Sequence, residues 1–307
     1  MPVIRIIEVG PRDGLQNEPT PIPTEIKRDF IVALAGAGLT EIEATSFVSP
    51  KWVPQLGDAA ELWPQIASLA DRGVRLSALV PNQKGLERAI GCGCQAIAVF
   101  TAASDAFTQK NIGMSVAESL TVFAEVVAAF RALQPDGWVR GYVSTAFECP
   151  YAGRIAPAKV AEVAERLLAM GVDEVSIGDT IGVAAPSEVR ILSSALLDAG
   201  PAGKFAFHFH DTRGTAIANV AEALDQGFTA FDASAAGLGG CPYAPGAGGN
   251  LATEDLVYFL TRSGLPTVDA IDLTSLAQAS RPILDYLGRP PSARSQRAVL
   301  AETSPTQ

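Results

Sequence analysis

The stretch IRIIEVGPRDG, residues 4–14, joins a short apolar run to a tight turn. The run Ile4–Val9 is rich in β-branched residues, which predicts a first strand. In a doubly wound open sheet, the first strand usually ends in a glycine-rich turn that binds phosphate. The turn Gly10–Gly14 lacks that glycine spacing. This stretch therefore favours a closed barrel over an open sheet.

Apolar runs of strand length alternate with helical patterns along the rest of the chain. Strands are expected at Ile4–Val9, Glu41–Ser46, Arg75–Val80, Ala96–Ala102, Val139–Thr145, Glu174–Asp179, Lys204–His210 and Ala230–Ala235. Apolar spacing of three and four residues predicts helices such as Glu25–Ala37, Val116–Leu133, Ala158–Met170 and Ala216–Gln226, with an eighth helix at Thr253–Thr261. Strands connected through helices run parallel. Eight such units predict the α/β class and a (β/α)8, or TIM, barrel.

The chain length fits one barrel with a short addition. A barrel takes about 250 residues, and this chain has 307. We expect residues 1–265 to form the catalytic barrel and residues 266–307 to form a C-terminal helical extension and tail of the same domain. From about Arg289 onward the sequence predicts an irregular end.

Composition excludes several classes of protein. The formal net charge of −10 argues against nucleic acid as a partner, because phosphate binding needs a basic face. No apolar stretch approaches the roughly 18 residues of a membrane helix, and the N-terminus has the pattern of a strand, not of a signal peptide. Of four cysteines only Cys92 and Cys94 are close in sequence, and we interpret both as packing residues. Reduced thiols predict a cytoplasmic protein.

His208 and His210, the only two histidines, end the expected seventh strand. Residues two apart on a strand point to the same side, so both imidazoles can face one ion. Imidazole nitrogens bind several divalent metals, and added oxygen ligands favour Mg²⁺ or Mn²⁺. The alternative is a pair of hydrogen-bonded core histidines. The spacing, the strand end and the following Asp211 favour a metal site.

Acidic and basic residues follow other expected strands. Asp13 can supply a carboxylate to the ion, and Arg12 can stabilise an enolate or carboxylate oxygen. Taken alone, this pair is more typical of a surface turn that ends at Gly14. Glu43 and Asp179 lie in strands two and six, where an acid is costly unless a cation is near. Each can orient ligands, bind Arg12, or form a structural ion pair.

The glycine-rich segment Gly237–Asn250 follows the eighth strand, and we expect it to be a mobile loop at the mouth of the barrel. Cys241 in this loop is placed for reaction rather than packing. The Asn250 side-chain oxygen can complete an ion's coordination. The alternative is a flexible connection with an incidental cysteine. Cys149 follows strand five and faces the same end.

Several segments together closely resemble the 3-hydroxy-3-methylglutaryl-CoA lyase family. The matching stretches are Glu8–Glu18, Ile42–Pro54, Arg140–Ser144, Cys149–Tyr151, Val175–Val183, Phe207–Gly214 and Asp232–Tyr258. They span most of the expected barrel. The last stretch, with cysteine between glycines, distinguishes the lyases from relatives that make isopropylmalate or homocitrate. Arg213, where many members have tyrosine, and Pro19, where lysine is common, depart from the pattern.

The resemblance implies roles for the candidate residues. It implies that the ligands of Mg²⁺ or Mn²⁺ are Asp13, His208, His210 and Asn250. It implies that Arg12 stabilises the enolate of the departing acetyl thioester and that Cys241 takes part in proton transfer. Glu43 and Asp179 match acids that support the site, and His208 is implicated in catalysis as well as in metal binding.

The implied reaction is a retro-Claisen cleavage of 3-hydroxy-3-methylglutaryl-CoA to acetyl-CoA and acetoacetate, a step of leucine catabolism. The resemblance implies an acyl-CoA substrate, and we expect a homo-oligomer, specifically a dimer. Three alternatives stay open: a lyase for a larger 3-hydroxy-3-substituted glutaryl-CoA, a Claisen-type synthase joining acetyl-CoA to a 2-keto acid, and a non-catalytic acyl-CoA binding protein.

Overall fold

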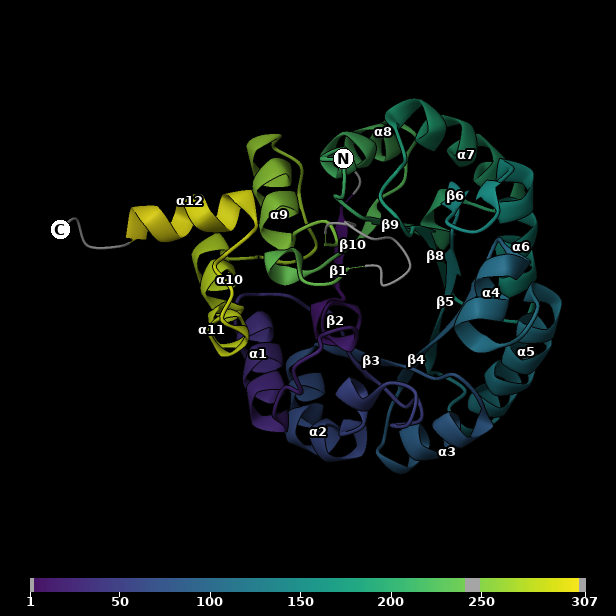
Figure 1. Cartoon of the computed structure of the whole chain (residues 1–307), viewed down its shortest axis with the longest axis horizontal. Coiled ribbons are helices and arrows are strands. Elements are labelled where there is room, and N and C mark those ends of the chain that lie inside the picture. Colours follow the sequence, from purple (N-terminus) through teal and green to yellow (C-terminus); the bar gives the residue numbers. More distant parts are fainter. Residues whose placement is uncertain (1–2, 241–248, 304–307) are drawn as a thin grey trace.

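The computed structural model describes residues 3–240 and 249–303 of the chain, and its eight parallel strands close into a barrel (Figure 1). The strands, in their order around the barrel, are β1 (Arg5–Glu8), β10 (Ala230–Ala233), β9 (Phe205–Phe209), β8 (Glu174–Asp179), β5 (Trp138–Ser144), β4 (Ala96–Ala102), β3 (Arg75–Leu79) and β2 (Glu41–Ser46). All eight expected strands are confirmed, with ends within two residues of the prediction. The predicted (β/α)8 barrel is therefore correct.

Helices surround the barrel on its outside. They are α1 (Thr24–Gly36), α2 (Ala59–Ile66), α3 (Gln83–Gly91), α4 (Asp105–Ile112), α5 (Val116–Leu133), α6 (Pro157–Ala169), α7 (Pro186–Ala199), α8 (Ala216–Asp225) and α9 (Thr253–Arg262). The start of α5 illustrates how local sequence sets a boundary. Ser115 accepts a hydrogen bond from the Glu118 amide, and the Glu118 carboxylate accepts one from the Ser115 amide.

Strand β9 shows how the alternation of side chains divides the core. Phe205, Phe207 and Phe209 are fully buried in the large cluster between strands and helices. The residue between two of them, Ala206, belongs to a small cluster with Ile7. Successive strand residues point to opposite faces, so His208 lies on the face of Ala206. The periodicity of β9 thus directs His208 into the barrel and away from the helices.

The C-terminal region is more regular than expected. Helices α10 (Leu273–Ala279), α11 (Arg281–Leu287) and α12 (Arg294–Thr303) pack beside α1 and α9, at the left of Figure 1. The expectation of an irregular end from about Arg289 holds for residues 289–293 but is wrong for α12. Asp255 on α9 accepts hydrogen bonds from the amides of Arg294 and Ser295, which fixes the start of α12.

A short hairpin, β6 (Glu148–Cys149) with β7 (Gly153–Arg154), lies after β5 and was not expected. Its strands of two residues are too short to produce a hydrophobic pattern.

No single helix in residues 3–240 and 249–303 is long and apolar enough to cross a membrane. Within the same described residues, α4 and α5 taken together pass the test by length and composition, and they are bent by 61° relative to each other.

Candidate active site

Three side chains that are distant in sequence converge at the carboxyl end of the barrel. Asp13 lies in a single π-helical turn, Gly10–Gly14, that follows β1, while His208 lies in β9 and His210 comes directly after it. One ligand atom of each lies within 4.8 Å of those of the other two. The imidazole ring centroids are 5.2 Å apart. The expectation that both histidines face one point together with Asp13 agrees with this geometry.

Asn250 adds an oxygen to this group. Its side-chain nitrogen donates to Asp13 Oδ2 at 2.9 Å and to the carbonyl of Leu238 at 3.0 Å. Its side-chain oxygen is buried and accepts no hydrogen bond from the part of the chain that the structure describes. A buried acceptor without a donor is costly. One carboxylate, two imidazoles and this amide oxygen therefore form a donor set that fits a divalent cation with mixed nitrogen and oxygen ligands.

Charges around the site keep Asp13 ionised. Burial would raise the pKa of Asp13, but the adjacent guanidinium of Arg12 and the charge of His208 outweigh it and lower that pKa to about 2. Burial would likewise lower the pKa of His208, but the hydrogen bond with Asp232 and the negative charges of Asp232 and Asp13 together outweigh burial, and the pKa is raised. Asp13 is thus available as an anionic ligand at neutral pH.

Arg12 is 6% exposed, so its interpretation as part of a surface turn is wrong. It forms ion pairs with Asp13 at 2.7 Å and Glu43 at 2.8 Å. The hydroxyl of Tyr142 donates to the same Glu43 oxygen at 2.6 Å, and the Arg12 guanidinium lies 5.2 Å from the centre of the Tyr142 ring. A fixed positive charge is therefore held directly beside the candidate metal ligands.

Glu43 and Asp179 have different partners. Glu43 binds Arg12, which was one of its expected arrangements. The Asp179 carboxylate instead accepts hydrogen bonds from the backbone amides of Val183 and Ala184, both at 3.0 Å. Burial raises the pKa of Asp179 to about 6, although these two hydrogen bonds oppose the shift. Asp179 therefore shapes the loop after β8, and its hydrogen bonds to that loop distinguish it from Glu43.

Cys241 lies outside the described residues. Within the glycine-rich segment, the backbones of Gly237 and Gly249 lie close together. A Cβ added to Gly249 would lie 1.7 Å from the Gly237 carbonyl oxygen, so position 249 requires glycine. Cys149 is buried, and its sulfur accepts a hydrogen bond from the Ser104 hydroxyl at 3.1 Å.

Sequence reasoning assigned no role to three buried polar residues on the strands, Arg140, Ser176 and Asp232. Asp232 is close to His208 and Ser176, and Arg140 forms an ion pair with Asp232 at 2.6 Å. The signal that could have found Arg140 and Asp232 is the one used for Glu43, a charge inside an otherwise apolar strand.

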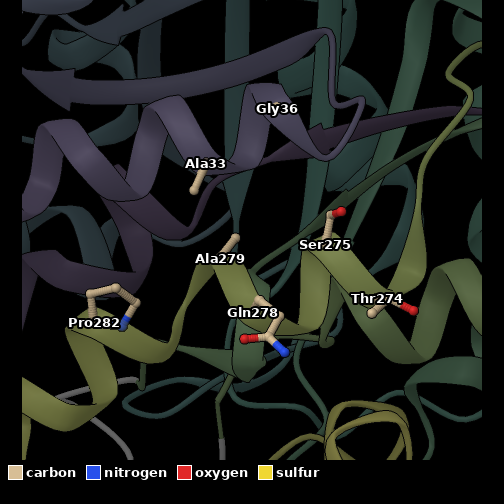
Figure 2. Close-up of a pocket in the computed structure, with 7 residues that line it drawn as sticks. All are labelled: Ala33, Gly36, Thr274, Ser275, Gln278, Ala279 and Pro282. Carbon is tan, nitrogen blue, oxygen red and sulfur yellow. The ribbon is translucent and has the colours of Figure 1, made fainter. Parts of the chain in front are cut away.

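The cavity at the helical periphery has a different character (Figure 2). It has a volume of about 350 Å³ and lies between α1 and the helices α10 and α11. The residues that line it are Ala33, Gly36, Thr274, Ser275, Gln278, Ala279 and Pro282. None of these seven carries an ionisable side chain. The barrel end, where acids, imidazoles and Arg12 converge, is the better candidate for chemistry.

Comparison with known proteins assigns the family. The family model described as HMGL-like matches residues 3–283. The chain belongs to this family. It is 48% identical over 295 residues to the mitochondrial hydroxymethylglutaryl-CoA lyase of Rattus norvegicus, covering 96% of this chain and 89% of that protein.

Solved structures agree with the family. The chain is similar to the crystal structure of hydroxymethylglutaryl-CoA lyase from Pseudomonas aeruginosa, with a TM-score of 0.93, 46% identity and 98% coverage of both chains. It also resembles an HMG-CoA lyase from Acinetobacter baumannii in complex with coenzyme A and 3-methylmalate, with a TM-score of 0.89 and 38% identity, covering 98% of this chain and 95% of that one. The close match extends over the whole barrel and the C-terminal helices.

Proposed function

We propose that this member of the HMGL-like family is a carbon–carbon lyase that cleaves 3-hydroxy-3-methylglutaryl-CoA to acetyl-CoA and acetoacetate. The observation that carries the proposal is the convergence of Asp13, His208 and His210 directly beside the buried Arg12. Relatives about half identical over nearly the whole chain are named as lyases for this substrate, which supports the same chemistry here.

The proposed ligands of a divalent metal are Asp13, His208, His210 and Asn250, and their oxygen content favours Mg²⁺ or Mn²⁺. When bound, such an ion would act as a Lewis acid toward the substrate hydroxyl and lower its pKa. The chain's own contribution is to hold the donor atoms together in a buried site.

Cleavage begins when the tertiary 3-hydroxyl loses its proton. We propose that the pair formed by Asp13 and His208 accepts this proton; the Oδ2 atom of Asp13 and the Nε2 atom of His208 lie 3.9 Å apart. The C2–C3 bond then breaks, C3 becomes the ketone of acetoacetate, and the electron pair passes to the thioester as an enolate. The guanidinium of Arg12, fixed by Glu43, stabilises the new negative charge on the enolate oxygen.

The enolate carbon must then gain a proton to give acetyl-CoA, and we propose that Cys241 donates or relays it. Substrate should protect this thiol from alkylation if the proposal is correct. Asp179 is proposed to support the site through the loop after β8, since it binds two amides of that loop.

A panel of substrates can establish which acyl group the enzyme prefers. Arg213, where many relatives have tyrosine, donates to the carbonyls of Ile181 and Gly182 at 3.0 and 2.9 Å, beside the Asp179 loop. This difference motivates a test of larger 3-hydroxy-3-substituted glutaryl thioesters. A coupled assay of acetyl-CoA release over that panel should give the highest kcat/KM with the 3-methyl substrate.

The remaining outcomes of this assay separate the alternatives. A larger substrate with higher kcat/KM would replace the 3-methyl compound. Consumption of acetyl-CoA with a 2-keto acid would identify a Claisen-type synthase, and tight acyl-CoA binding without turnover of any panel member would identify a binding protein.

We further propose that the protein acts on its acyl-CoA substrate as a homodimer in the cytoplasm, within leucine catabolism. Curated relatives include both mitochondrial and cytoplasmic lyases, so the family alone leaves the compartment open. Light scattering of the purified chain and fractionation of its cells test the two statements separately.

A further inference from the structure

Asp232 on β10 occupies the centre of a buried polar cluster behind His208. It is 1% exposed. One carboxylate oxygen, Oδ1, lies 2.6 Å from a terminal nitrogen of Arg140. The other oxygen, Oδ2, accepts a hydrogen bond from the Ser176 hydroxyl at 2.8 Å and lies 3.1 Å from Nδ1 of His208. Asp232 therefore connects a metal-ligand candidate to three strands of the barrel.

These contacts determine which ring nitrogen of a neutral His208 carries the proton. An ionised carboxylate only accepts hydrogen bonds, so Nδ1 must be the donor toward Asp232. Nε2 then has a free lone pair. This atom is on the side of Asp13, with 3.9 Å between Nε2 and Asp13 Oδ2.

We propose that Asp232 is a positioning residue that fixes His208 in the Nδ1–H form and thereby presents the Nε2 lone pair to the active site. The position of the ring proton follows from the contacts of Asp232 alone. Only the role of the Nε2 lone pair, which is to bind the cation or to accept the substrate proton, rests on the proposed function. Arg140 and Ser176 contribute by holding the Asp232 carboxylate in one orientation.

The variant Asp232→Asn tests this assignment because the surrounding groups dictate how the new amide must lie. A guanidinium has no acceptor, so the amide oxygen must face Arg140. The amide nitrogen then takes the place of Oδ2 and donates toward Ser176 and Nδ1 of His208. The ring proton is displaced to Nε2, and the lone pair on the active-site side is lost.

The chain has two histidines, which makes the proton position directly measurable. With ¹⁵N-labelled histidine, the ring nitrogen shifts of the full-length chain are recorded at a pH where the imidazoles are neutral. The variant His210→Gln assigns the signals. We expect wild-type His208 to carry its proton on Nδ1 and the Asp232→Asn variant to carry it on Nε2. Titration with Mn²⁺ should show binding weakened by roughly 10- to 100-fold in that variant.

Glu174→Gln provides a matched control. Glu174 forms an ion pair with the same Arg140, at 3.0 Å, but is not among the contacts of His208. Neutralising it should disturb the buried charge balance without changing the proton position or the Mn²⁺ affinity. If both variants weaken Mn²⁺ binding equally, Asp232 acts through general electrostatics and the proposal is wrong.

The wild-type spectrum decides the matter even if Asp232→Asn fails to fold. A proton on Nε2 of His208 in the wild-type chain overturns the proposal, whatever the variant does. Absence of Mn²⁺ binding by the wild-type chain would contradict the proposed metal site, whereas the position of the ring proton would still test Asp232.

Discussion

The two ends of the barrel use charged residues in opposite ways. At the amino end, Arg5, Glu41 and Arg75 are the first residues of their strands, and Glu41 forms ion pairs with Arg5 at 2.7 Å and Arg75 at 3.0 Å. At the carboxyl end, Asp13 shares a small volume with two imidazoles and an amide oxygen that lacks a donor among the described residues. The ion pairs at the amino end neutralise one another and stabilise the fold. The converging ligand atoms at the carboxyl end instead fit a bound cation.

Arg140 links the two arrangements. Its Nε lies 3.0 Å from Glu174, the first residue of β8, and a terminal nitrogen lies 2.6 Å from Asp232 behind the site. The guanidinium is 1% exposed, so both acids are compensated inside the barrel. The comparison of the two ends predicts that changes at the carboxyl end affect turnover, whereas changes at the amino end affect stability.

Metal removal should give the largest effect, and only at the carboxyl end. Loss of a Lewis acid costs several kcal/mol of transition-state stabilisation, or roughly 1,000-fold or more in rate. We expect chelation to abolish acetyl-CoA release and Mg²⁺ or Mn²⁺ to restore it. Circular dichroism checks that the fold persists. Full activity in protein shown by elemental analysis to be metal-free would contradict the ligand assignment.

Arg12→Gln should have the next largest effect, because its charge meets an enolate that exists only in the transition state and after it. We expect a loss of about 3–4 kcal/mol, or two to three decades in kcat, with little change in KM. Arg12→Lys should recover little, since one ammonium does not replace the planar fork. Steady-state kinetics provides the measurement.

Arg5→Gln, at the amino end, is the matched control for Arg12→Gln and should leave kcat unchanged. A rise in KM for Arg12→Gln at constant kcat would mean that Arg12 only anchors the substrate.

Glu41→Gln should affect stability alone. This substitution leaves Arg5 and Arg75 without their shared carboxylate and should lower the free energy of unfolding by about 1–3 kcal/mol. Burial opposes ionisation of Glu41, but the arginines outweigh it and lower its pKa. Its stabilising contribution is therefore present above its ordinary pKa and lost in acid. Urea unfolding at several pH values, beside kcat, tests this, and a loss of turnover in the folded variant would contradict the division between the two ends.

Glu254, near the carboxyl end of the barrel, should show the opposite pH dependence of stability. Both of its carboxylate oxygens accept a hydrogen bond from the Ala236 amide, and no arginine in residues 3–240 and 249–303 forms an ion pair with it. Burial raises its pKa to about 8, against opposing hydrogen bonds. The folded state retains a proton that the unfolded chain releases, so stability falls as pH rises from 4.5 to about 8.

In Glu254→Gln the free energy of unfolding should therefore decline less between about pH 5 and pH 8 than in the wild-type chain. The burial of Glu8 raises its pKa to about 7, so part of the decline should persist in this variant. Equal declines in the wild-type chain and the variant would assign the effect elsewhere.

Local sequence patterns account for the strands, the helices and the shared face of the two histidines. Apolar runs of strand length predicted the strands, and spacing over three and four residues predicted the helices. Because residues two apart on a strand point to the same side, His208 and His210 were expected on one face. The alternation of strands and helices predicted the barrel, and the resemblance to a family of barrel enzymes strengthened that prediction. Asp13 was found as a candidate because it follows the first strand, and active sites of barrels lie where strands end.

The contacts between residues far apart in the chain depend on how the barrel closes. Closure of the barrel pairs β1 with β10, and β10 with β9, which brings Asp13, Asp232 and His208 together from three separate segments. The pairing of Arg12 with Glu43 and the burial of Arg140 between two acids also depend on contacts between strands far apart in the chain. No local pattern encodes such pairs, because a charge inside a strand predicts the need for a partner and leaves its identity to the fold.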